Sequence, residues 1–105
     1  MKIKEDGSKI YPYTRNDGLQ VEKFLFNNGF HAVLIGSLSH GKESEKDIDI
    51  LLPYNNLTWF TKRKLLKIFG CKNFVITDWG GLFMYNTYFG DIDIFFKGQD
   101  EEFDY

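Results

Sequence analysis

Two aspartates with one residue between them, Asp47 and Asp49, open an apolar segment that ends at Leu52. Because side chains alternate along a β-strand, both carboxylates project from one face, with Cα atoms roughly 6.6 Å apart. Two like charges on one face repel each other unless a cation lies between them. A divalent cation with hard oxygen ligands explains the pair. Mg²⁺ is the first choice, because it binds one or two carboxylates together with substrate phosphates and water.

Two further segments could complete such a site. Gly36 and Ser37 follow directly after an apolar run. Glycine lets the backbone come close to a phosphate, serine supplies a hydroxyl, and a helical turn that begins there would point free N–H groups at an anion. The last apolar segment supplies Asp91 and Asp93, again on one face. A two-metal site needs about three carboxylates, so one of these two acids completes the set if the strands are neighbours.

The elements around the first acids are a helix and two strands. Asp17 and Gln20 fit a capping box, and apolar residues then recur with helical spacing up to an Asn-Gly stop, which predicts a helix over residues 18–28. The apolar run 30–35 is typical of a strand buried on both faces. The paired aspartates and the residues after them predict a second strand over 47–52, stopped by proline.

A second helix is expected from a cap at Asn55 or Asn56 to about Phe69. One side of this helix is basic, and we interpret it as a solvated helix face in preference to a surface that tracks phosphates. The basic residues are Lys62, Arg63, Lys64 and Lys67. Trp59 is expected in the core or in an interface.

Three more strands are predicted over residues 73–77, 82–88 and 91–96, with glycine-containing turns between them. The element order is therefore helix, strand, loop, strand, helix and three strands. This order predicts an α/β (α+β) fold, with a small mixed sheet of about five strands and two helices on one face.

The chain has 105 residues and a formal net charge of -2, which suits one domain without an overall basic field. Any contact with nucleic acid must therefore be local. We expect a single domain with a polar lead-in over 1–16 and an acidic tail over 98–105. The single cysteine excludes an intramolecular disulfide, and no apolar run of about 18 residues occurs, so we expect a cytoplasmic protein without membrane contact.

The pattern of Gly36-Ser37, Gly41, Asp47 and Asp49, followed much later by an acid between apolar residues, resembles the nucleotidyltransferase fold superfamily. It is most similar to the palm of family X DNA polymerases. It is also similar to the minimal nucleotidyltransferases, which include the antitoxins paired with helical ribonuclease toxins. The resemblance covers residues 30–52 and 88–97 and implies a palm-like sheet.

The resemblance also implies roles for the acids. In that superfamily the paired acids and a third strand acid bind two metal ions, and the third acid activates the incoming hydroxyl. Carried over, Asp47 and Asp49 are the paired ligands and Asp93 is the third, with Asp91 as its alternative. All three are then catalytic and metal-binding residues. The expected cofactor is Mg²⁺, as two ions, with Mn²⁺ as a possible substitute.

Family X polymerases usually carry a basic pair where this chain has Ser39 and His40. The grip on a triphosphate must therefore come from His40, Lys42, Lys46 or a partner. The nucleotide-binding residues expected from the resemblance are Gly36, Ser37, His40 and Lys46. Nothing after Phe96 could form the subdomain that normally cradles base and template, so we do not expect a templated polymerase.

These observations favour a magnesium-dependent nucleotidyltransferase that moves a nucleoside monophosphate from a nucleoside triphosphate (NTP), such as ATP, to a hydroxyl on protein or RNA. The alternative is a non-catalytic binding module of the same fold that recognises a protein or a nucleotide. In either case we expect a second surface to close the site, supplied by a homodimer or a helical companion protein.

Overall fold

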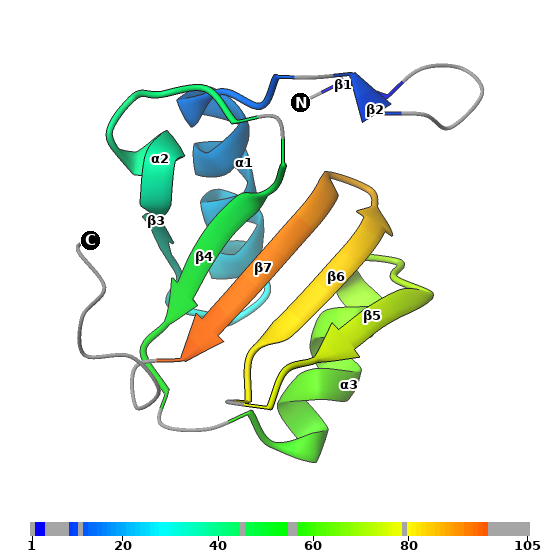
Figure 1. Ribbon diagram of the computed structural model, residues 1–105. Coiled ribbons are helices and arrows are strands. Elements are labelled where there is room, and N and C mark those ends of the chain that lie inside the picture. The colour runs from blue at the N-terminus through cyan, green and yellow to red at the C-terminus, as the bar shows by residue number, and fades with distance from the viewer. Residues whose placement is uncertain are drawn as a thin grey trace.

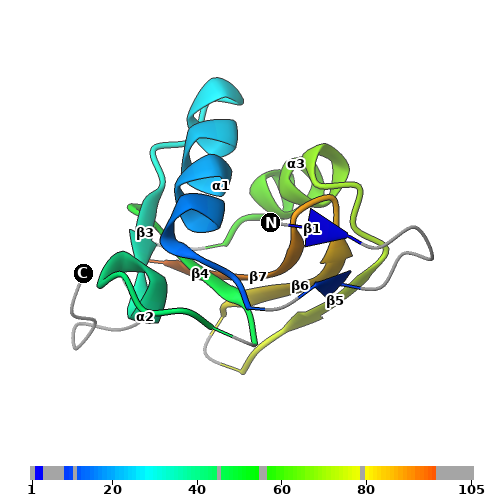
Figure 2. The same ribbon diagram turned by 90° about the horizontal axis from the view of Figure 1, so that it is seen from above.

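The computed structural model of the protein describes residues 2–3, 9–10, 12–44, 46–54, 57–78 and 80–96. Its centre is a five-stranded sheet with the strand order β3-β4-β7-β6-β5. The strands are β3 (Val33–Ile35), β4 (Ile48–Leu52), β5 (Asn73–Ile76), β6 (Leu82–Thr87) and β7 (Gly90–Phe96). Helices α1 (Arg15–Asn27) and α3 (Trp59–Ile68) cover one face of this sheet, and the short helix α2 (Gly36–Ser39) follows β3 (Figure 1, Figure 2).

The sheet is mixed, because one of its strand pairs is parallel. The central strands β4 and β7 run in the same direction, whereas the pairs β3 with β4, β7 with β6 and β6 with β5 are antiparallel. This arrangement confirms the expected α+β fold, with a mixed five-stranded sheet and two helices on one face. No helix among the described residues has the length and apolar content that a membrane span needs.

The hydrophobic core lies between the sheet and the two long helices. Alternate residues of β4 and β7 are fully buried, and they pack with apolar residues from the inner faces of α1 and α3. The residues at the centre of this core are Ile48, Ile50, Leu52, Ile92, Ile94, Phe96, Val21, Leu25 and Leu65. Because side chains alternate along a strand, the residues between them face the opposite side of the sheet, which Figure 1 shows toward the viewer.

Both long helices begin at threonine caps that the sequence patterns did not predict. Helix α1 starts three residues earlier than expected, because Thr14 is the N-cap and Asp17 forms the capping box with it as the third helical residue. Helix α3 is capped by the side chain of Thr58, which accepts a hydrogen bond from the Thr61 N–H at 3.1 Å. The caps expected at Asp17 and at Asn55 or Asn56 were therefore wrong, and both asparagines lie outside the described residues.

The expectation of a strand buried on both faces holds for Leu34 and Ile35, which point to opposite faces of β3. Strand β3 is nevertheless an edge strand of the sheet. It is also shorter than predicted, and Val33 is exposed. The N–H of Leu34 donates a hydrogen bond of 2.8 Å to Oε2 of Glu22 in α1. The helix thus supplies a hydrogen-bond partner to this edge strand.

The polar lead-in expected over residues 1–16 contains more structure than predicted. Strands β1 (Lys2–Ile3) and β2 (Lys9–Ile10) form a separate antiparallel pair, and Tyr13 is fully buried. The acidic tail expected over 98–105 lies outside the described residues. The N-terminal segment therefore contributes to the core through Tyr13.

Candidate metal centre

The central strands β4 and β7 position three carboxylates on the face of the sheet opposite α1 and α3. Asp47 directly precedes β4, Asp49 is the second residue of β4, and Asp93 lies in β7. The parallel register places Asp49 beside Asp93. The alternation of β4 puts Asp47 on the same face as Asp49. One residue that directly precedes β4, one within β4 and one within β7 thus meet at a single place.

The three carboxylates converge closely enough to share a cation. One ligand oxygen from each of Asp47, Asp49 and Asp93 lies within 4.8 Å of the other two. Asp93 is 8% exposed, and the other two are partly buried. A donor set made only of carboxylate oxygens suits a hard divalent cation such as Mg²⁺ or Mn²⁺. The residues present therefore fit the metal that the sequence pattern implies.

Electrostatics in the metal-free site favour protonated carboxyls. Burial, the negative charge of Asp47 and a hydrogen bond shared with Asp47 raise the pKa of Asp49 to about 7. Burial raises the pKa of Asp93 to about 9, with further contributions from a hydrogen bond to Asp47 and from the charges of Asp47, Asp49 and Asp91. Every one of these causes disfavours negative charge. A cation that binds here would reverse the effect, because it favours the ionised carboxylates.

Gly36 forms a wall of the site. Its φ is +72°, and a Cβ atom at this position would lie 2.6 Å from Oδ2 of Asp49. Glycine therefore satisfies two demands at once, a left-handed backbone and a close approach to the carboxylate. Ser37 lies in the first turn of α2 and is exposed, and the Ser39 hydroxyl donates to the Gly36 carbonyl at 2.6 Å.

Tyr13 joins the two acid-bearing segments, a role that sequence reasoning missed. Its backbone pairs with Ser44 through hydrogen bonds of 2.7 and 3.0 Å, and the Ser44 hydroxyl accepts from the N–H groups of Lys46 and Asp47 at 3.2 and 3.4 Å. The Tyr13 hydroxyl accepts from the Asp91 N–H at 3.1 Å. Through these hydrogen bonds, buried Tyr13 connects the segment that precedes β4 with the start of β7.

Asp91, the alternative third acid, lies outside the group of three. Its Oδ1 accepts a hydrogen bond of 3.0 Å from the N–H of Asn86, whose φ is +56° at an irregularity in the pairing of β6 with β7. Asp91 thus stabilises the hairpin in the structure. Of the two acids in β7, Asp93 is the one that the structure brings to Asp47 and Asp49.

The side chains predicted to contact phosphate follow one another between the end of α2 and the start of β4, and they are exposed. His40 ends α2 at the end away from Gly36, and Lys46 immediately precedes Asp47. Lys42 lies between them in the loop and is also exposed. No hydrogen bond among the described residues joins the side chains of His40, Lys42 or Lys46 to the acids. They remain candidates for contacts with a bound triphosphate.

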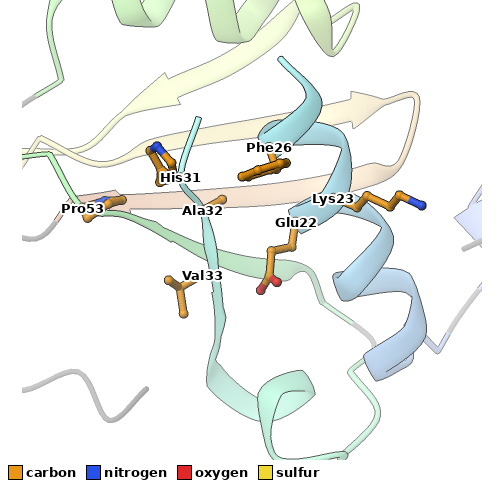
Figure 3. A pocket seen from close by; sticks show the side chains of 7 residues that line it. All are labelled: Glu22, Lys23, Phe26, His31, Ala32, Val33 and Pro53. Atoms are coloured by element: carbon orange, nitrogen blue, oxygen red, sulfur yellow. The ribbon is translucent and has the colours of Figure 1, made fainter. Parts of the chain in front are cut away.

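A hollow of about 310 Å³ lies elsewhere, between α1 and the edge strand β3. Figure 3 shows Glu22 and Phe26 of α1 facing His31 and Val33 across it. The rings of Phe26 and His31 meet edge to face with centroids 6.0 Å apart. None of the three acids lines this hollow, so His31 has no part in the candidate metal centre.

Comparison of the chain with protein-family models, with curated proteins and with solved structures found no significant match.

Proposed function

We propose that the chain is a metal-dependent nucleotidyltransferase that transfers a nucleoside monophosphate from an NTP to a hydroxyl on protein or RNA. The observation that supports this proposal is the convergence of Asp47, Asp49 and Asp93 from two parallel central strands. A purely structural set of buried acids would be costly, because each pair repels and burial disfavours all the charges. A function that needs bound cations explains why the chain carries them.

In the proposed site Asp47, Asp49 and Asp93 would hold two Mg²⁺ ions. Bound Mg²⁺ neutralises charge on the triphosphate and on the attacking and leaving oxygens. Because the three carboxylates lie on the central strands of the sheet, they would fix the positions of the cations. The cations in turn would determine where negative charge on the triphosphate is neutralised. Gly36 leaves space beside Asp49, and the exposed Ser37 hydroxyl can donate to a phosphate oxygen.

The proposed reaction is an in-line transfer. The acceptor hydroxyl gives its proton to the carboxylate of Asp93, and its oxygen forms a bond to the α-phosphorus of the NTP. The bond from the α-phosphorus to the bridging oxygen breaks, and pyrophosphate leaves with that electron pair. In the proposed site, bound cations would keep the carboxylate of Asp93 ionised, so that it could accept this proton.

The test is incubation of the purified chain with each α-labelled NTP and Mg²⁺, alone and with RNA or candidate acceptor proteins. Label should appear on the acceptor with the wild type and be lost with Asp49→Asn and Asp93→Asn. Asp78→Asn is the matched control, because Asp78 is an exposed acid in the turn after β5. Label that is equal in all four proteins contradicts the assignment. Nucleotide binding without transfer supports the non-catalytic module instead.

A further inference from the structure

Helix α3 carries two large aromatic side chains on its outer surface. Trp59 is 66% exposed and Phe60 is 72% exposed, so of the core or interface position expected for Trp59 the structure excludes the core. Both belong to a face of α3 on which residues recur at helical spacing and border a hollow of about 480 Å³. We call this face the α3 patch; it consists of Trp59, Phe60, Arg63, Lys64 and Lys67.

The α3 patch is basic as well as aromatic. Helix α3 contains four lysine and arginine residues and no acid, although the chain as a whole has a net charge of -2. Three of these cations lie over rings, and two of the three belong to the α3 patch; the third is Lys62, whose ammonium is 6.0 Å from the centroid of Phe74. The Arg63 guanidinium is 4.7 Å from the centroid of a Trp59 ring, and the Lys64 ammonium is 5.0 Å from that of Phe30. The positive charges are thus concentrated beside the exposed aromatic surface.

This combination fits one kind of ligand better than others. An acidic peptide would pair with the cations but would leave most of the surface of Trp59 and Phe60 in water. An apolar protein surface would cover the rings but would bury the cations without counter-charges, which is unfavourable. A single-stranded nucleic acid satisfies both, because its phosphates pair with lysine and arginine while its unpaired bases stack on aromatic rings.

We infer that the α3 patch binds single-stranded nucleic acid, with phosphates on Arg63, Lys64 and Lys67 and bases stacked on Trp59 and Phe60. The exposed rings of Trp59 and Phe60 beside these cations favour the phosphate-tracking interpretation of α3 over a merely solvated face. Figure 2 shows α3 on the helical side of the sheet, whereas the three acids lie on the opposite face because they alternate with the core residues of β4 and β7. The inference therefore goes beyond the proposed transferase and does not depend on it.

The test is fluorescence anisotropy of a labelled single-stranded oligonucleotide of mixed sequence, titrated with the full chain in EDTA. EDTA separates this binding from any metal-dependent step. Three phosphate contacts would give a slope of about -2 for log K against log salt. Trp59→Ala should weaken binding at least about fivefold, the loss expected for one stacked base. Arg63→Ala should weaken binding and reduce the salt slope by about 0.7.

Lys23→Ala is the matched control, since Lys23 is an exposed cation on α1. It should bind the oligonucleotide as the wild type does, and so should Asp49→Asn, even if that variant has no transferase activity. Equal affinity of wild type, Trp59→Ala and Arg63→Ala would overturn the inference, as would the absence of binding at low salt. Equal affinity for a polyglutamate peptide would also overturn it, because the patch would then recognise negative charge alone.

Discussion

Replacement of Asp93 by asparagine should make the metal-free protein more stable at neutral and alkaline pH. The pKa of Asp93 is raised from 3.8 to about 9 in the folded chain. A raised carboxyl pKa means that the folded chain holds a proton that the unfolded chain has released. The contribution of protonated Asp93 to the free energy of unfolding is therefore greatest below about pH 4 and is lost as the pH rises toward 9. Asparagine has nearly the same shape as aspartate and does not ionise, so the variant should not lose this stability as the pH rises.

The magnitude follows from one proton. Between about pH 5 and pH 8, one proton released from the coupled acids should lower the free energy of unfolding of the wild type by at most about 1.4 kcal/mol per pH unit, or about 4 kcal/mol in total. This is a large share of the roughly 5–15 kcal/mol that stabilises a typical domain. Asp49, with its pKa raised to about 7, adds to the fall over the lower part of the range.

The assay is urea unfolding in EDTA, followed by far-UV circular dichroism at pH 5, 6, 7 and 8. The free energy of unfolding of Asp93→Asn should depend less on pH than that of the wild type, and it should exceed the wild-type value at pH 8. Saturating Mg²⁺ should stabilise the wild type most at pH 8, because the cation binds the ionised carboxylates. Parallel pH dependences for wild type and Asp93→Asn would refute the reasoning, with Asp78→Asn as the control.

Three other substitutions test how the site and the sheet edge are built. Gly36→Ala should lower the free energy of unfolding by about 1–2 kcal/mol, because a left-handed φ disfavours alanine. It should also reduce the rise in melting temperature that Mg²⁺ causes. A rise equal to that of the wild type would mean that Gly36 is not a wall of the site. Tyr13→Phe should lower the free energy of unfolding by about 1 kcal/mol, because the Asp91 N–H loses its acceptor; wild-type stability in urea would contradict this. Glu22→Ala should increase self-association measured by light scattering, because the N–H on the outer side of β3 loses its partner; an unchanged mass distribution would show that this edge is protected in another way.

The sequence predicted the element types well because apolar periodicity reflects burial directly. Strands β4 to β7 lie within one or two residues of their predicted positions. Helix α2 was anticipated only as a helical turn after Gly36 and Ser37, because its four residues are too few to show a helical period. The cap at Thr14 was missed because Thr14 with Asp17 and Asp17 with Gln20 are competing patterns of the same spacing. Sequence alone does not say which of them the tertiary structure uses.

The candidate site was predictable in part. The spacing of Asp47 and Asp49 on a strand gives their common face, but their distance from Asp93 depends on the parallel pairing of β4 with β7, which no local pattern encodes. The edge position of β3 could not be predicted for a similar reason, because a short apolar run has the same sequence pattern in a central strand and in an edge strand. Tyr13 acts through contacts with residues far away in the chain, and its position in a polar segment gave no signal.

The pairing of β4 with β7 has a consequence for how the molecule is assembled. It joins two antiparallel units, β3 with β4 and β5 with β6 and β7, each of which is formed by neighbouring parts of the chain. Asp47 and Asp49 belong to the first unit and Asp93 to the second. The carboxylates therefore converge only after the two units have docked, late in any folding route that completes local pairs first. In the absence of a cation, the repulsion between the carboxylates opposes this docking. A cation bound by carboxylates of both units would instead stabilise the docked arrangement.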